Sequence, residues 1–142
     1  MRAGFTLVEM LVVLALLALV MAIAPPLLGA RQGEAQLAAA ARELAAALRE
    51  TRSLALRDGR TEVFVIDAAA GAFRAGPGAV RHLAPGLALA AVSGDRQAPQ
   101  PIGAIRFFAD GSSTGGTLLL LQGERRSHVT VDWLTGRVAL AR

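Results

Sequence analysis

The chain of 142 residues contains no cysteine, no tyrosine and no lysine, and only 4% of its residues are aromatic. Without cysteine it can form neither a disulfide framework nor a thiolate metal site, so an exported domain must be held together by packing alone. Without lysine it cannot form a P-loop of the usual sequence. Its 15 arginines are interspersed with 11 acidic residues to a net charge of +4, which argues only weakly for a polyanionic partner.

A second absence is that of charge within residues 10–30, where no side chain is ionisable and Leu, Val, Ala, Met and Ile fill most positions. Such a run has the length of about 20 residues that spans a bilayer core. The residues that follow are enough for one small domain with its own core. The sequence therefore predicts an apolar anchor and a single domain.

Three interpretations of the N-terminal segment remain open on these grounds. A secretory signal peptide would have Arg2 as its basic region, residues 11–19 as its apolar region and residues 22–24 as its cleavage site. The acidic Glu9 and the position of Pro25 fit this interpretation poorly. The second interpretation is a plain membrane helix. The charge of Glu9 would then cost about 2.5 to 3.5 kcal/mol at the centre of the membrane, and less near its surface.

The third interpretation rests on the residues MRAG, FTLVE and the apolar run behind them. This pattern resembles the N-terminal signal of type IV pilins and type II secretion pseudopilins. The resemblance implies that a prepilin peptidase cuts between Gly4 and Phe5 and that Phe5 becomes N-methylated. It also implies that Glu9 docks onto the new amine of a neighbouring subunit, so that two charges that are each costly in lipid neutralise one another.

The resemblance also implies a division of the chain and its location. We expect a leader peptide at 1–4, a transmembrane and filament-core helix at 5–28, an amphipathic helix at 29–59 and a periplasmic antiparallel β domain at 60–142. The anchor would cross the bacterial inner membrane once with its N-terminus in the cytoplasm, before the subunit enters the pseudopilus. Pro25 and Pro26 predict a kink or loosened turn, or an end of the membrane helix at Ala24.

Helical periodicity is strong between the anchor and Gly59. Small and apolar residues recur at alternating spacings of four and three, which places them on one helix face. This face comprises Leu37, Ala41, Leu44, Leu48, Thr51 and Ala55, with Leu54 beside the last. Asp58 and Gly59 predict the end of the helix, since glycine readily adopts the left-handed capping conformation.

After Gly59 the pattern changes to that of strands. Residues 61–67 and 87–92 are strand candidates, 68–73 turns the chain into a short second strand, and 76–101 reads as loops and edge strands. Four further candidates with short connections follow, AIRFFAD, TLLLLQ, SHVTVDW and RVALA. The fold class is therefore α+β, type IV pilin-like, with a long N-terminal helix packed on an antiparallel sheet or pair of sheets.

Two stretches narrow the resemblance, RFFADGSSTGG at 106–116 and VDWLTGRV at 131–138. They are similar to the H-type minor pseudopilins of type II secretion, the general secretion pathway protein H group, although Ala109 stands where that family usually has proline. The resemblance implies a structural subunit of the pseudopilus that drives export of folded proteins across the outer membrane. Its implied partners are the prepilin peptidase, other major and minor pseudopilins, the inner-membrane assembly platform and, as a further candidate, the secreted proteins.

We interpret both stretches as structural turns, not as an enzyme site. DGSSTGG, at 110–116, is interpreted as a hairpin between antiparallel strands. A serine nucleophile would need a base, and His82 and His128 are in no recognised arrangement. No calcium loop is recognisable, so no metal and no cofactor are expected. Trp133 is interpreted as a core or sheet-corner anchor, and exposure of its side chain would instead favour a binding platform. The turn residues are Asp110, Gly111, Ser112, Ser113, Thr114, Gly115 and Gly116 in the first stretch, and Asp132, Trp133, Leu134, Thr135 and Gly136 in the second.

The alternative function is that of a minor type IV pilin involved in pilus assembly or DNA uptake, with a C-terminal domain that binds DNA. Phosphate contacts would come from Arg125, Arg126, Arg137 and Arg142, with an affinity that falls steeply with salt. Acidic residues lie among these arginines, and stacking aromatics other than Trp133 are lacking. The sequence therefore favours the secretion subunit over nucleic-acid binding.

Overall fold

The computed structural model describes residues 6–93, 96–100 and 102–141, but not the side chains of residues 22–31, 91–93, 96–100 and 102. The chain divides into two compact units, Met1–Glu34 and Ala35–Arg142. Each unit is described by itself below.

The helix α1 extends over Leu7–Asp58 and therefore runs through both units. Its backbone is helical through Pro25 and Pro26, so the alternative that a helix ends at Ala24 is wrong. A proline inside a helix costs about 3 kcal/mol, and the Leu- and Ala-rich segments on both sides favour the helix strongly enough to continue it. A kink at the two prolines stays a prediction.

In the first unit, the described side chains of α1 are exposed from Leu7 to Met21. Many are large and apolar, with exposed fractions from 43% at Val13 to 81% at Leu7. Among the described residues, no helix has an apolar stretch long enough to cross a membrane.

In the second unit, the predicted helix stripe is the face that α1 buries. Each of its members from Leu37 to Ala55 is at most 5% exposed, except the flanking Leu54, which is half-buried. The hydroxyl of Thr51 donates a 2.9 Å hydrogen bond to the carbonyl oxygen of Ala47, which satisfies it inside the core. The helix ends at Asp58, and Gly59 follows with a φ of 62°, as predicted.

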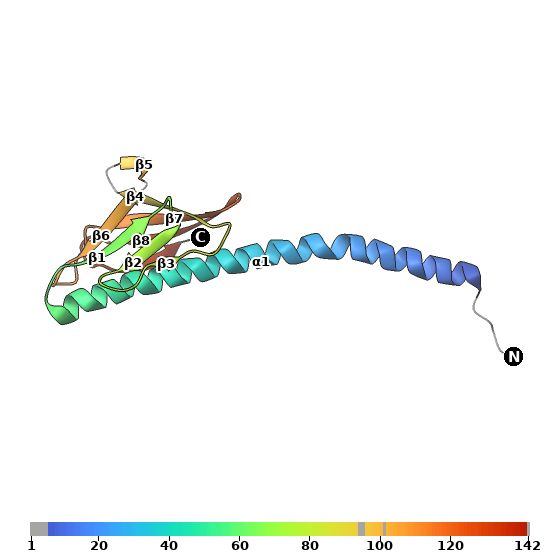
Figure 1. Cartoon of the computed structure of the whole chain (residues 1–142), viewed down its shortest axis with the longest axis horizontal. Coiled ribbons are helices and arrows are strands. Elements are labelled where there is room, and N and C mark those ends of the chain that lie inside the picture. Colours follow the sequence, from blue (N-terminus) through green and yellow to red (C-terminus); the bar gives the residue numbers. More distant parts are fainter. Residues whose placement is uncertain (1–5, 94–95, 101, 142) are drawn as a thin grey trace. The chain divides into compact units, whose positions relative to one another are not determined.

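The described residues of the second unit form two antiparallel sheets (Figure 1). The first has the strand order β3-β2-β1-β6 and the second the order β5-β4-β7-β8-β9. The strands are β1 Glu62–Asp67, β2 Ala72–Ala75, β3 Arg81–His82, β4 Ala88–Ser93, β5 Arg96–Gln100, β6 Ile102–Phe107, β7 Gly116–Gln122, β8 Arg125–Val131 and β9 Val138–Ala141.

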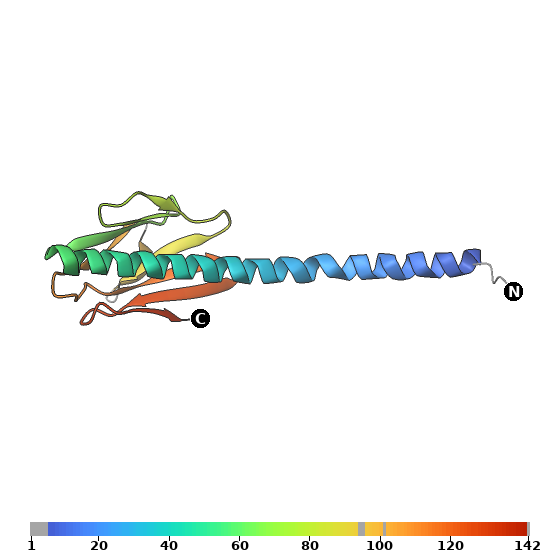
Figure 2. The ribbon, with the colours of Figure 1, turned by 90° about the horizontal axis from the view of Figure 1, so that it is seen from below.

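One hydrophobic core joins α1 to both sheets. Alternate residues of β1 and β8 are buried, as expected for strands with one face on a core. Figure 2 shows the second unit's part of α1 crossing in front of both sheets. The sheets contribute Phe64, Ile66, Phe73, Ala75, Ile105 and Phe107 from one side and Leu89, Leu118, Leu120, Val129 and Val131 from the other. Because all members of this core lie in the second unit, that unit carries its own core.

The α+β class is confirmed, with a pair of sheets, and two edge strands lie within residues 76–101. These are β3 and β5, each at the end of its sheet. The expectation of loops and edge strands alone is wrong for β4, which lies in the same stretch but pairs with β5 on one side and β7 on the other. The interpretation of DGSSTGG as a hairpin between paired strands is wrong. It connects β6, which pairs with β1, to β7, which pairs with β4 and β8, so the chain crosses from one sheet to the other. A short connection therefore does not guarantee pairing when two sheets share one core.

Candidate functional site

The N-terminal residues singled out by the resemblance are only partly described. Gly4 and Phe5 lie outside the described residues. Glu9 is exposed in the first turn of α1, and its amide donates to the hydroxyl oxygen of Thr6 at 3.3 Å and to the carbonyl oxygen of Thr6 at 3.1 Å. Thr6 thus caps the helix, a role that sequence reasoning missed although Thr-x-x-Glu is a known capping signal.

The first signature turn, residues 110–116, is held by its own side chains. One carboxylate oxygen of Asp110 accepts hydrogen bonds from the amide of Ser112 at 2.9 Å and from its hydroxyl at 2.6 Å. Gly111, Gly115 and Gly116 have positive φ values of 85°, 69° and 145°, which only glycine adopts without strain. These glycines let the chain turn sharply between the two sheets.

The second signature turn, residues 132–136, repeats this arrangement between β8 and β9. A carboxylate oxygen of Asp132 accepts from both the amide and the hydroxyl of Thr135 at 2.7 Å. The amide of Gly136 donates to the carbonyl oxygen of Asp132 at 2.9 Å, and Gly136 has a φ of 61°. Asp132 lies after the end of β8 at Val131, so it belongs to the turn and not to the strand.

Ser113 joins the two signature turns. Its amide donates to the carbonyl oxygen of Trp133 at 2.8 Å and its hydroxyl to that of Asp132 at 2.9 Å. The same hydroxyl oxygen accepts from the amide of Gly115 at 3.0 Å. Ser113 is buried, so two turns from different parts of the sequence form one hydrogen-bonded corner.

This corner is also tied to α1 through Arg52. The Nε atom of Arg52 donates a 3.0 Å hydrogen bond to the carbonyl oxygen of Gly111. Arg52 is not among the residues of the predicted helix face. No local spacing signals this contact, because its partner lies more than 50 residues away.

The interpretation of Trp133 as a core anchor is wrong. Its side chain is 66% exposed, and that of the next residue, Leu134, is 62% exposed. The tight turn uses the backbone of Trp133 as a hydrogen-bond acceptor and directs the indole to solvent. Tryptophan is among the residues enriched at the centres of protein interfaces, so this exposed side chain is a candidate contact.

The signature aspartates have lowered pKa values. The hydroxyl of Ser112 and then its amide lower the pKa of Asp110 below the ordinary value of 3.8. The hydroxyl and amide of Thr135 lower the pKa of Asp132 in the same way, with a smaller contribution from the charge of Arg137. Both carboxylates are therefore ionised at neutral pH and act as fixed acceptors.

The arginines proposed for DNA contact do not form one patch. Arg125 and Arg126 begin β8, whereas Arg137 follows the turn beyond its end. Because a strand rises about 3.4 Å per residue, these groups attach to the backbone about 20 Å apart. Arg142 lies outside the described residues.

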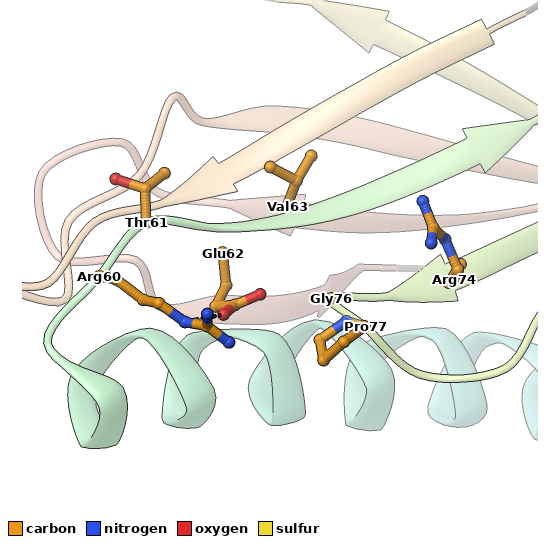
Figure 3. A pocket seen from close by; sticks show the side chains of 7 residues that line it. All are labelled: Arg60, Thr61, Glu62, Val63, Arg74, Gly76 and Pro77. Carbon is orange, nitrogen blue, oxygen red and sulfur yellow. Dashed lines mark ion pairs between the residues drawn. The ribbon is translucent and has the colours of Figure 1, made fainter.

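A pocket of about 350 Å³ lies beside the ends of β1 and β2 and contains charges that pair with each other (Figure 3). The Nε atom of Arg60 lies 2.8 Å from a carboxylate oxygen of Glu62, whose side chain is 9% exposed. Figure 3 shows this pair on the side of α1, while Arg74 points the other way. Arg60 thus neutralises the charge of Glu62, the more buried of the two side chains.

Comparison with known proteins decides the family. Residues 40–136 match the model of the family described as type II transport protein GspH. The chain belongs to the GspH family. Residues 1–25 also match the prokaryotic N-terminal methylation motif, which covers the positions of Gly4, Phe5 and Glu9. Both parts of the sequence resemblance are thereby confirmed.

A relative with a curated name gives the same assignment. Type II secretion system protein H of Xanthomonas campestris pv. campestris is 39% identical to this GspH-family chain over 137 residues. The match covers 95% of this chain and 80% of the relative. The GspH-family chain is a minor pseudopilin of type II secretion, and its family is one of structural pseudopilins.

Solved structures show that the fold is shared more widely. The minor pseudopilin EpsH from the type 2 secretion system of Vibrio cholerae matches with a TM-score of 0.59 at 18% identity, over 75% of this chain and 96% of EpsH. The type IV minor pilin FimU of Pseudomonas aeruginosa also matches with a TM-score of 0.59 at 18% identity, over 77% of this chain and 90% of FimU. The fold is therefore type IV pilin-like. The fold alone does not distinguish a secretion subunit from a pilus subunit, and it is the sequence matches that assign the chain to type II secretion.

Proposed function

We propose that this GspH-family chain is processed between Gly4 and Phe5, anchored by the first part of α1, and built into a pseudopilus through docking of Glu9. The single observation that carries this proposal is the match of residues 1–25 to the N-terminal methylation motif. The exposed position of Glu9 in the first turn of α1 supports it, since a docking carboxylate must reach a neighbouring subunit.

The proposed anchor crosses the inner membrane once, with its N-terminus in the cytoplasm and the second unit in the periplasm. Its support is the uncharged run at residues 10–30 and the exposure of the apolar side chains from Leu7 to Met21. In a filament, the same apolar surface would pack against the helices of neighbouring subunits. Prepilin peptidase, other pseudopilins and the inner-membrane assembly platform are the proposed partners.

The mass of the N-terminal peptide tests the proposed processing. We expect chains isolated from cells with an active prepilin peptidase to begin at N-methylated Phe5. A start at Pro25 would instead identify a removed signal peptide, and it would abolish the anchor.

Paired variants test the docking role. We expect Glu9→Ala and Glu9→Gln to leave cleavage intact and to impair incorporation into the pseudopilus equally, because docking needs the charge. Thr6→Ala removes only the cap hydrogen bond to its hydroxyl, which is worth about 1 kcal/mol, and is expected to incorporate far better. Normal incorporation of Glu9→Gln would show that docking does not depend on the negative charge of Glu9.

A further inference from the structure

A second pocket, of about 430 Å³, is bordered by α1 and by the segment that joins the second signature turn to β9. It differs from the pocket of Arg60 and Glu62 because three arginines and no acidic residue line it. Its lining consists of Arg49, Arg52, Ser53, Gly136, Arg137 and Val138.

Two of the three arginines are held in place by backbone carbonyl groups. The Nη2 atom of Arg49 donates to the carbonyl oxygen of Val138 at 3.2 Å, and Nε of Arg52 donates to that of Gly111 at 3.0 Å. Each guanidinium has five N–H donors, so both retain donors for another acceptor. The positions of two charges are thus fixed before any ligand binds.

Within the part of the chain that the structure describes, none of the three guanidinium groups is held in an ion pair. No ion pair within 4.0 Å joins any of them to a described carboxylate. Glu50, on the same helix, pairs with Arg81 at 2.8 Å, and Asp132 is committed to its own turn. Like charges around one pocket repel each other. The nearby charge of Asp132 offsets only part of that of Arg137, so an anion that enters the pocket is still attracted by all three guanidinium groups.

We propose that the pocket of Arg49, Arg52 and Arg137 binds a carboxylate of a neighbouring subunit in the assembled pseudopilus. Guanidinium groups match the planar geometry of a carboxylate and bind it with two parallel hydrogen bonds. This inference rests on the proposed function as a filament subunit. The inference names residues outside the anchor that would contact a neighbouring subunit, and it names the chemical group that they bind.

The second signature turn indicates that the carboxylate comes from a protein. Trp133 and Leu134 lie in the turn that leads to Arg137, and both are more than 60% exposed. A free ion would leave these apolar side chains in water, whereas a protein surface that carries the carboxylate can cover them. Tryptophan and arginine are the residues most enriched among those that dominate protein interfaces.

Binding of a small carboxylate to the full chain in neutral detergent tests the pocket. The probe is N-acetyl-glutamate at constant ionic strength, followed by the amide NMR signals of Ser53, Gly136 and Val138. We expect saturable shifts whose dissociation constant rises roughly three- to tenfold in Arg137→Gln. Arg126→Gln, at the exposed start of β8, is the matched control and leaves the constant unchanged. An absence of saturation, or equal weakening by both variants, would overturn the proposal.

A charge reversal in secreting cells tests the partner. Arg137→Glu is expected to reduce incorporation into the pseudopilus at least tenfold, while Arg126→Glu incorporates normally and Arg137→Lys recovers part of the loss. The Arg137 side chain makes no hydrogen bond in the described structure, but its charge attracts Asp132. Arg137→Glu should therefore melt somewhat below the wild type and still be folded at the temperature of the assay. If the probe or inorganic sulfate binds but Arg137→Glu assembles normally, the pocket serves free anions and the subunit contact is refuted. Failure of the wild type itself to incorporate would instead refute the proposed function.

Discussion

The carbonyl oxygen of Gly111 accepts a 3.0 Å hydrogen bond from Nε of Arg52, which fixes the first signature turn to α1. The second signature turn packs against the same atom, because a Cβ at Gly136 would collide with the oxygen of Gly111 and lie 2.8 Å from Nε of Arg52. Both turns and the helix therefore meet at one point. The corner therefore fixes the two sheets to α1.

Gly136→Ala is expected to be the most disruptive of the glycine changes at this corner. It places a side chain at a φ of 61° and against backbone that cannot move without breaking the corner. We expect the free energy of unfolding to fall by about 2 to 4 kcal/mol. Urea unfolding of residues 35–142, followed by circular dichroism, measures this loss.

Gly123→Ala is the matched control for that experiment. Its φ of 60° is nearly the same, but nothing lies within 4 Å of the added Cβ. It should cost only the conformational strain of about 1 to 2 kcal/mol. Equal losses in the two variants would show that the corner does not depend on the close approach.

Ser113→Ala is expected to loosen the two signature turns from each other. The change removes the hydroxyl that donates to Asp132 and accepts from Gly115, and it leaves buried polar groups without their partners. The cost should be about 1 to 3 kcal/mol. Ser112 is next to it but half-buried, and its hydroxyl is bonded only to Asp110, so Ser112→Ala should cost less than about 1 kcal/mol.

Hydrogen exchange distinguishes this loosening from a general loss of stability. In Ser113→Ala, the backbone amide at position 113 should exchange faster than in the wild type. The exchange rates of the paired amides of β1 and β6 should keep the same order, from slowest to fastest, as in the wild type. Uniform acceleration across both sheets would contradict a local role for Ser113.

The helix and most strands could be predicted from the sequence because their signals are local. The stripe from Leu37 to Ala55 follows helical spacing, and the alternation in residues 61–67 follows strand spacing. The division into two sheets could not be predicted, because β1 pairs with β6 across the whole middle of the domain. Local signals say which residues form strands but not which strands pair.

The site was predictable only where the chemistry lies within a few residues. Asp110 bonds Ser112 and Asp132 bonds Thr135, and their spacing suggests both contacts. The contact of Arg52 with Gly111 has no such signal. The exposure of Trp133 depends on how the turn directs its side chain, and hydrophobicity alone points to the core.

Acid should weaken the corner through its two aspartates. The folded pKa values of Asp110 and Asp132 lie below the ordinary value of 3.8 because hydroxyl and amide donors stabilise the carboxylates. Their stabilisation is therefore present above the unfolded pKa and is lost as the pH falls through the lower folded pKa. We expect the double variant Asp110→Asn, Asp132→Asn to be less stable at neutral pH and to lose less stability on acidification below about pH 4 than the wild type.

Urea unfolding at a series of pH values from neutral to strongly acidic measures this difference in slope. Replacing Glu43, an exposed glutamate of α1, with glutamine is the control, and it should leave the slope of the wild type unchanged. A double variant with the same acid sensitivity as the wild type would show that the two carboxylates contribute nothing through their charge.

Trp133 is the single tryptophan of the chain, so its fluorescence reports on one exposed turn. In the isolated subunit we expect water-exposed emission that acrylamide quenches almost as readily as it quenches free tryptophan. In assembled pseudopili the emission should shift to shorter wavelength and resist quenching, because a neighbouring subunit covers the indole. Leu134→Ser, which retains the fluorophore, should reduce this protection. Shielded emission in the isolated subunit would contradict the exposure of Trp133. If assembly leaves the quenching by acrylamide unchanged, the second signature turn takes no part in the contacts between subunits.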